Sequence, residues 1–113
     1  MPPDPILSPE CDKTRERNMP AGYIIAQIDV SDASAFEEYR KQVPGTIKQY
    51  GGEYIVRGGK QEDLEGTPNP RTVVVRFDSF DRAREWYYSS EYEKPKALRQ
   101  AASTGNAVLV EGV

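Results

Sequence analysis

Residues 22–52 read GYIIAQIDVSDASAFEEYRKQVPGTIKQYGG, and this stretch predicts a β-strand followed by a long helix. Strand character runs over residues 23–30, where β-branched and other apolar residues dominate. Asp32 is a good N-cap for the helix that follows. After it, apolar side chains recur at intervals of three and four residues and form one helix face: Phe36, Tyr39, Val43, Ile47 and Tyr50. Pro44 predicts a kink within this helix because proline lacks a backbone donor, and Gly51-Gly52 predicts its end.

Further strands are predicted at residues 53–57, 71–77 and 106–111, and a polar connection joins the first two of these. Between the last two strands, Ser79 caps one helix and Ser89-Ser90 starts another that runs to about Ala102. Pro95 predicts that this last helix is broken or begins late. The order βαββαβ is that of the ferredoxin-like α+β fold, with a four-stranded antiparallel sheet and both helical layers on one face.

Composition and charge exclude several classes of function. The chain has 113 residues, which suits one domain, and a net charge of −3 argues against nucleic-acid and anionic-membrane partners. It has no histidine, which excludes haem held by histidine, zinc sites containing histidine and Ser-His-Asp triads within the chain. There is no metal-ligand spacing or phosphate-binding glycine loop. We therefore expect a cytoplasmic protein with no metal and no cofactor.

Residues 1–18 differ in composition from the rest of the chain. They hold four of the nine prolines and little apolar content, which predicts a flexible tail preceding a domain over residues 19–113. The alternative is an arm that docks on a partner. The single cysteine, Cys11, lies in this segment, so an intrachain disulfide is impossible.

The strand parities divide the predicted sheet into two faces. The more apolar sets, such as Ile24/Ala26/Ile28 and Val73/Val75/Phe77, fit the face that the helices cover. The opposite face mixes apolar and polar side chains and is predicted to pair two copies into a homodimer around a partly polar cavity. This predicted dimer face comprises Ile25, Gln27, Ile55, Val74, Arg76, Leu109 and Glu111. The alternative is that its charges extend to water at strand ends and enclose no cavity.

Several short segments carry a resemblance to a known family. They include YGGEYIVRGG (50–59), LEG (64–66), REWYYSSEY (84–92) and VLVEGV (108–113). With the first strand, they make the chain from residue 22 onward resemble the bacterial family known as domain of unknown function 1330, within the dimeric α+β barrel superfamily. The resemblance implies a barrel-forming homodimer with a cavity, and it implies no agreed activity. Arg76 departs from the family pattern, in which an acidic residue is common.

A few residues are candidates for chemistry, each with a structural alternative. Arg57, Glu65 and Tyr39 are weak candidates for catalysis, because arginine can bind a carboxylate and a buried carboxyl or tyrosine can move a proton. The alternative for Arg57 and Glu65 is a mutual ion pair. The predicted ligand-binding residues are Arg57 and a group near the second and third helices: Trp86, Tyr87, Tyr92 and Arg99. The alternatives are core packing for these aromatic residues, and an ion pair with Glu91 for Arg99.

Two functions stay open from the sequence. One is a metal-free enzyme that acts on a small aromatic or carboxylate-bearing molecule in a cavity at the sheet face. The other is a non-catalytic module, which either binds a small ligand or serves dimerisation alone. Whether the protein is an enzyme is not decided by these residues.

Overall fold

The computed structural model describes residues 20–113; the predicted tail over residues 1–18 lies outside that range. The elements follow the predicted order, with four strands and three helices. The strands are β2 (Gly22–Val30), β3 (Glu53–Arg57), β4 (Arg71–Phe77) and β5 (Ser103–Glu111). The helices are α1 (Ala33–Gln49), α2 (Phe80–Tyr87) and α3 (Ser90–Ala102).

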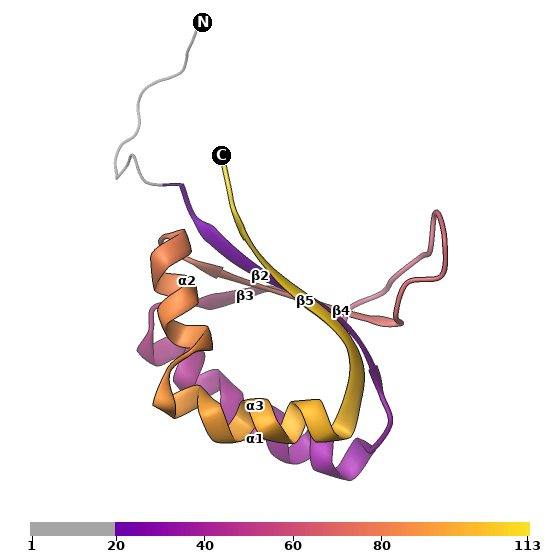
Figure 1. The fold of residues 1–113 in the computed structure, drawn as a ribbon. Coiled ribbons are helices and arrows are strands. Elements are labelled where there is room, and N and C mark those ends of the chain that lie inside the picture. The colour runs from indigo at the N-terminus through magenta and orange to yellow at the C-terminus, as the bar shows by residue number, and fades with distance from the viewer. Residues whose placement is uncertain (1–19) are drawn as a thin grey trace, which may run out of the picture.

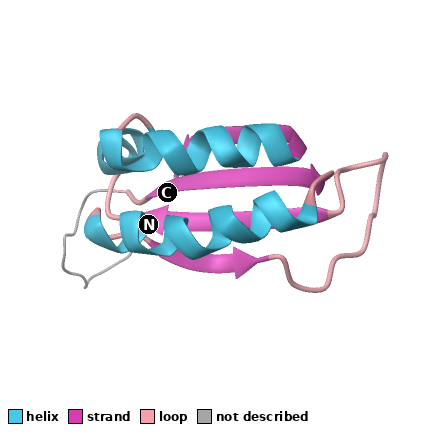
Figure 2. Ribbon diagram, turned by 90° about the horizontal axis from the view of Figure 1, so that it is seen from below, coloured by secondary structure: helices cyan, strands magenta, loops and turns pink. Residues whose placement is uncertain are grey.

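The four strands form one antiparallel sheet in the order β3-β4-β2-β5. This is the ferredoxin-like arrangement, so the predicted fold class is confirmed. All three helices lie on the same side of the sheet (Figure 1), and the view from below shows α1 running beside the layer of α2 and α3 (Figure 2). None of the helices within residues 20–113 combines the length and the apolar character needed to cross a bilayer.

Helix α1 begins as the sequence predicts. The Asp32 carboxylate accepts hydrogen bonds from the backbone N–H of Ala35 at 3.1 Å and from the hydroxyl of Ser34 at 3.0 Å. The helix continues through Pro44, and its apolar stripe faces the sheet, with Phe36, Val43 and Ile47 buried. This stripe forms the part of the core that α1 contributes.

Helix α3 differs from the prediction at Pro95. The helix is continuous from Ser90, and Ser89 caps it by accepting the backbone N–H of Tyr92. Pro95 is buried inside this helix. Burial of its ring offsets the missing backbone hydrogen bond, so the proline is tolerated in the helix interior.

The Asp32 cap of α1 makes the stability of the fold depend on pH in the acid range. The hydrogen bond from Ala35, and then that from Ser34, lower the pKa of Asp32 below 3.8. A carboxyl whose pKa is lower in the folded state stabilises the fold above its unfolded pKa, and the gain is lost as pH falls through the folded value. We therefore expect the melting temperature of the wild type to exceed that of Asp32→Ala at neutral pH, with the difference shrinking below about pH 4.

Thermal melts of both proteins over a pH series measure this difference. Asp32→Asn is the matched control, because asparagine caps a helix without titrating in this range. A difference between wild type and Asp32→Ala that stays constant down to pH 2 contradicts the assignment.

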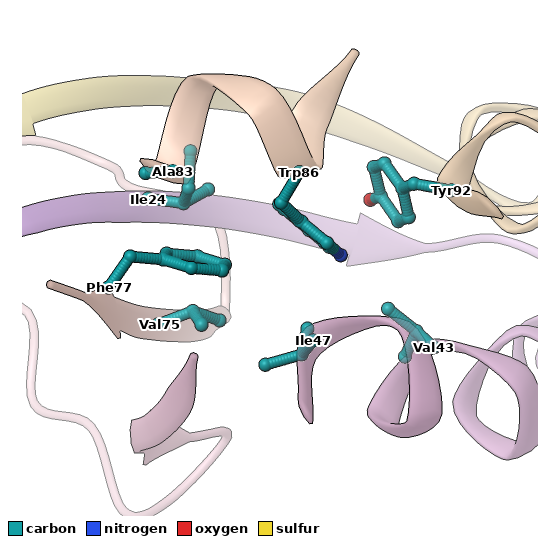
Figure 3. Packing of buried hydrophobic residues seen from close by; sticks show 8 residues of the cluster. All are labelled: Ile24, Val43, Ile47, Val75, Phe77, Ala83, Trp86 and Tyr92. Atoms are coloured by element: carbon teal, nitrogen blue, oxygen red, sulfur yellow. The ribbon is translucent and has the colours of Figure 1, made fainter. Parts of the chain in front are cut away.

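The main core lies between the sheet and the helices (Figure 3). Trp86 of α2 stands between Phe77 and Tyr92, with ring centroids 5.4 and 4.0 Å away. Its indole N–H donates to the Thr46 hydroxyl at 2.9 Å, so its polar atom is satisfied inside the core. Aromatic packing thus continues from the centre of the domain to the space between α1 and α3.

Strand β5 corrects one predicted strand parity. It starts at Ser103, directly after α3, and pairs with β2 so that Leu109 lies opposite Ile24 on the helix side. Leu109 therefore packs against the core. Glu111 shares this parity and lines a hollow beside the start of α2. Both predictions were wrong because Ala107, Val108, Leu109 and Val110 make the two faces of β5 equally apolar.

Strand β3 corrects the other parity. A β-bulge lies between Tyr54 and Val56, so Val56 pairs with Val74 and Arg57 pairs with Val73. The inserted residue exchanges the two faces of the strand beyond it. Arg57 consequently faces the helices, whereas strict alternation with Ile55 would place it on the opposite face. Ile55, predicted on the dimer face, is the residue in the bulge.

The face of the sheet that no described helix covers carries a continuous apolar row, which we call the outer row. It consists of Val56, Val74, Ile25 and Val108, which neighbour one another across all four strands. Val108 is 51% exposed. A polar row borders it on one side, where the Gln27 amide donates to the Thr72 hydroxyl at 3.2 Å. Arg76 borders it on the other side, opposite Glu53 and Tyr23.

Candidate functional site

A partly open cavity lies between the helices and the sheet. Its enclosed part has a volume of about 50 Å³, which is room for about three water molecules. Apolar side chains from β2, β4 and α1 form its floor and walls. Four arginines also line it, and so do six aromatic residues: Phe36, Tyr39, Tyr54, Trp86, Tyr87 and Tyr92. The cavity is thus on the helix side of the sheet, whereas the sequence placed it between two paired sheets.

Two of the arginines come from the strands. Arg57 lies over the Tyr54 ring, 4.3 Å from its centroid, and Arg71 lies 5.5 Å from the centroid of Phe36. The Nε atom of Arg71 is buried and has no hydrogen-bond partner among residues 20–113. Burial, and then the positive charges of Arg40 and Arg57, lower the pKa of Arg71, which remains a cation at neutral pH.

A glycine makes room for the Arg71 guanidinium. Gly58 has a φ of +67°, and a Cβ atom there would overlap the Arg71 guanidinium. The backbone N–H of Gly58 donates to the Thr72 carbonyl at 2.9 Å, which holds the turn against β4. The RGG segment at residues 57–59 therefore supplies one cavity arginine and accommodates a second.

The positive charge of the cavity is not neutralised within the described part of the chain. The residues lining the cavity include no aspartate or glutamate. Among residues 20–113, Arg40 pairs with Glu37 at 3.3 Å on the surface of α1, and no ion pair is formed by Arg57, Arg71 or Arg99. Cations that converge without counter-charges repel one another, so this arrangement favours an anionic ligand.

The helices supply a different set of polar groups. Arg99 of α3 donates from Nε to the Tyr92 hydroxyl at 3.3 Å, and that hydroxyl lies 3.1 Å from the hydroxyl of Tyr39 on α1. Tyr92 is buried and Tyr39 is half-buried. Burial, followed by the proximity of Tyr92, raises the pKa of Tyr39 well above its usual value. Tyr39 is therefore suited to donate a hydrogen bond and not to act as a base.

The structure places all five residues predicted to bind a ligand around one cavity. Arg57, Trp86, Tyr87, Tyr92 and Arg99 all line the cavity. Trp86 is also a core residue, as its structural alternative proposed. Tyr87 is half-buried, and Lys96 lies 4.5 Å from its ring centroid.

Two other predictions at the site were wrong. Glu65 is exposed in the connection between β3 and β4 and does not line the cavity, and it forms no ion pair with Arg57. Glu91 does not pair with Arg99. Its carboxylate accepts a hydrogen bond from the Tyr50 hydroxyl at 2.8 Å.

Sequence reasoning missed Arg40, Arg71 and Tyr54 as cavity residues. A signal for Arg71 was present, because it continues the alternation Val73/Val75/Phe77 by one step toward the start of β4. Tyr54 is one of seven tyrosines, and nothing in its position in the sequence marks it as a cavity residue. Arg40 follows Tyr39 on α1, and nothing in its spacing distinguishes it from a surface arginine.

The chemistry that these groups support includes ligand binding and hydrogen-bond donation. Arginines and tyrosine hydroxyls are donors that match carboxylate, phosphate and carbonyl oxygens. Residues 20–113 contain no cluster of three or more Cys, Asp or Glu side chains placed to hold a metal ion.

Solved structures share this fold at low sequence identity. A protein of unknown function from Rhodopseudomonas palustris, RPA0582, is 14% identical, covers 90% of this chain and 95% of its own, and has a TM-score of 0.69. SnoaB, a cofactor-independent oxygenase from Streptomyces nogalater, is 12% identical over 80% of this chain and 91% of its own, with a TM-score of 0.61. A putative antibiotic biosynthesis monooxygenase from Caulobacter crescentus CB15 is 15% identical over 82% and 88%, with a TM-score of 0.57.

These likenesses establish the fold and not the activity. No curated protein matches the sequence. The model of one family, the domain of unknown function DUF1330, matches residues 21–113, which include every described element and every cavity residue. The chain is therefore a member of the DUF1330 family.

Proposed function

We propose that this protein binds a small organic carboxylate in the cavity between its helices and its sheet, as a cytoplasmic homodimer. The observation that carries the proposal is that Arg57, Arg71 and Arg99 have no carboxylate partner among residues 20–113, and above all that the buried Nε of Arg71 has no hydrogen-bond partner there. A buried donor without an acceptor costs about 1–3 kcal/mol, and a ligand oxygen would remove that cost.

The apolar and aromatic walls favour a ligand with an aromatic body. The enclosed volume suits one carboxylate group and little more. Arg40 and Arg57 are exposed at the edge of the cavity, so their side chains are free to move aside for a ring. Benzoate is accordingly a suitable first probe.

Titration calorimetry with benzoate tests the proposal, with benzyl alcohol as the neutral analogue of similar shape. We expect benzoate to bind and benzyl alcohol to bind at least tenfold more weakly, because charge-assisted hydrogen bonds contribute about 1.5–3 kcal/mol. Replacing Arg71 by glutamine should weaken the binding of benzoate about 10- to 100-fold. It should leave the melting temperature of the free protein unchanged or raised, since one repelling charge is removed.

Arg84→Gln is the matched control, because Arg84 lies outside the cavity and stacks over Tyr88. It should bind benzoate as the wild type does. Equal affinity of the wild type for benzoate and benzyl alcohol, or an Arg71→Gln variant with wild-type affinity, would remove the proposed function.

The outer row supports the homodimer. Four neighbouring apolar side chains across a whole sheet form a surface that stable soluble proteins seldom leave in water. A second copy presents the same row, and two such faces packed together would bury it on both sides. Of the predicted dimer-face residues, Ile25, Gln27, Val74 and Arg76 lie on this face; Val56 and Val108 replace Ile55 and Leu109 in the proposal.

A further inference from the structure

The hydrogen bonds on the helical wall of the cavity form a chain of three residues. The Nε of Arg99 donates to the Tyr92 hydroxyl at 3.3 Å, and the Tyr92 and Tyr39 hydroxyls are 3.1 Å apart. All three side chains line the cavity. Arg99 has no carboxylate partner among residues 20–113, so its charge acts on the tyrosines without being neutralised by that part of the chain.

Burial favours one direction for this chain of hydrogen bonds. Tyr92 is 2% exposed, so its hydroxyl proton needs an acceptor inside the protein. Within the described residues, the Tyr39 oxygen is the one acceptor within hydrogen-bond reach of it. Either hydroxyl could donate in this pair, and burial favours the arrangement in which Tyr92 accepts from Arg99 and donates to Tyr39. The hydroxyl proton of Tyr39 is then not used in the bond to Tyr92. Tyr39 is the half-buried member of the pair and lines the cavity, so this proton is available to a ligand there.

The charge of Arg99 makes the Tyr39 hydroxyl a stronger hydrogen-bond donor. Each hydrogen bond in a chain polarises the next, so a cation at one end makes the terminal hydroxyl a better donor. The raised pKa of Tyr39 means that the proton stays on its oxygen at neutral pH. The helical wall thus offers one directed donor, while Arg57 and Arg71 offer cationic donors from the strands.

We propose that Tyr39 is a specificity-determining residue that donates a hydrogen bond to a second oxygen of the bound carboxylate, with Tyr92 and Arg99 as its positioning residues. The ligand class is then an aromatic acid that carries a carbonyl or phenolic oxygen apart from its carboxylate. This inference rests on the proposed function, because the arginines of the strand wall must hold the carboxylate.

Matched ligand pairs isolate the second oxygen. The three positional isomers of acetylbenzoate are compared with the corresponding isopropylbenzoates, which replace the carbonyl oxygen by a methyl group. We expect at least one acetylbenzoate to bind the wild type about tenfold more tightly than its isopropyl counterpart, the effect of one good hydrogen bond. This preference should vanish in Tyr39→Phe, while the affinity for the isopropylbenzoate stays within about twofold.

The roles of Tyr92 and Arg99 are tested by the same ratio, the affinity for acetylbenzoate divided by that for isopropylbenzoate. Tyr92→Phe and Arg99→Met should each reduce the preference for acetylbenzoate, and Arg99→Lys should retain part of it because the cation remains. Tyr50→Phe is the control, since the Tyr50 hydroxyl donates to Glu91 away from the cavity. Melting temperatures identify any variant that fails to fold.

The outcomes separate the two proposals. If both acids bind equally well to the wild type and Arg71→Gln weakens both, the inference about Tyr39 is wrong and the proposed function holds. If Tyr39→Phe keeps the preference for acetylbenzoate, the inference is also wrong. If neither acid binds the wild type, the proposed function fails and the inference fails with it.

Discussion

Replacing Phe77 by alanine is expected to lower the free energy of unfolding by about 3–5 kcal/mol, the usual cost of removing a buried phenylalanine. Phe77 is 0% exposed and packs against Trp86 and Gly52. A domain of this size has a stability of only about 5–14 kcal/mol, so much of it would be lost. The melting temperature should fall by at least about 12 °C.

Thermal and urea denaturation followed by circular dichroism measure this loss. Leu64→Ala is the control, because Leu64 is 84% exposed in the connection between β3 and β4 and should change stability by less than about 0.5 kcal/mol. If the free energy of unfolding of Phe77→Ala lies within about 1 kcal/mol of the wild-type value, the core collapses around the missing ring and the expected cost of the cavity is wrong.

Replacing Val74 by aspartate is expected to convert the protein from dimer to monomer. Val74 lies in the outer row between Val56 and Ile25. A carboxylate buried there without a partner costs several kcal/mol, and a two-fold interface would contain it twice. The dimer dissociation constant should therefore rise by at least about 100-fold.

Light scattering coupled to size-exclusion chromatography measures the mass directly. The wild type should have twice the chain mass of 12.7 kDa at high micromolar concentration, and Val74→Asp should have the single mass. Val108→Asp, on the edge strand β5, should behave in the same way, whereas Leu64→Asp should remain dimeric. A monomeric wild type under these conditions contradicts the proposed dimer.

The sequence predicted the central strands better than the edge strands. In β2 and β4, alternation assigned Ile24, Ile28, Val75 and Phe77 to the helix side, and all four are buried. In β5 both faces are apolar, so alternation gave no basis for choosing between them. In β3 the bulge changes the parity after Tyr54, and no residue in EYIVR signals a bulge.

The candidate site could likewise be predicted only in part from the sequence. The aromatic residues of α2 and α3 could be predicted because they cluster in REWYYSSEY. Arg57 and Arg99 were predicted singly, but the convergence of the four arginines could not be predicted, since they come from four elements, α1, β3, β4 and α3, that meet only in the folded protein. A sequence shows how many charges a chain has, but the lack of a counter-charge around Arg71 within the described residues is a property of the fold.

Trp86 is the single tryptophan of the chain, and its position gives the protein an intrinsic optical reporter. Its indole contacts Phe77 and Tyr92 and is hydrogen-bonded to Thr46, so its emission depends on both the core and the cavity wall. Tyrosines within a few ångströms can transfer excitation energy to it. Fluorescence of one native residue can therefore follow unfolding and cavity occupancy in the same sample, without any label.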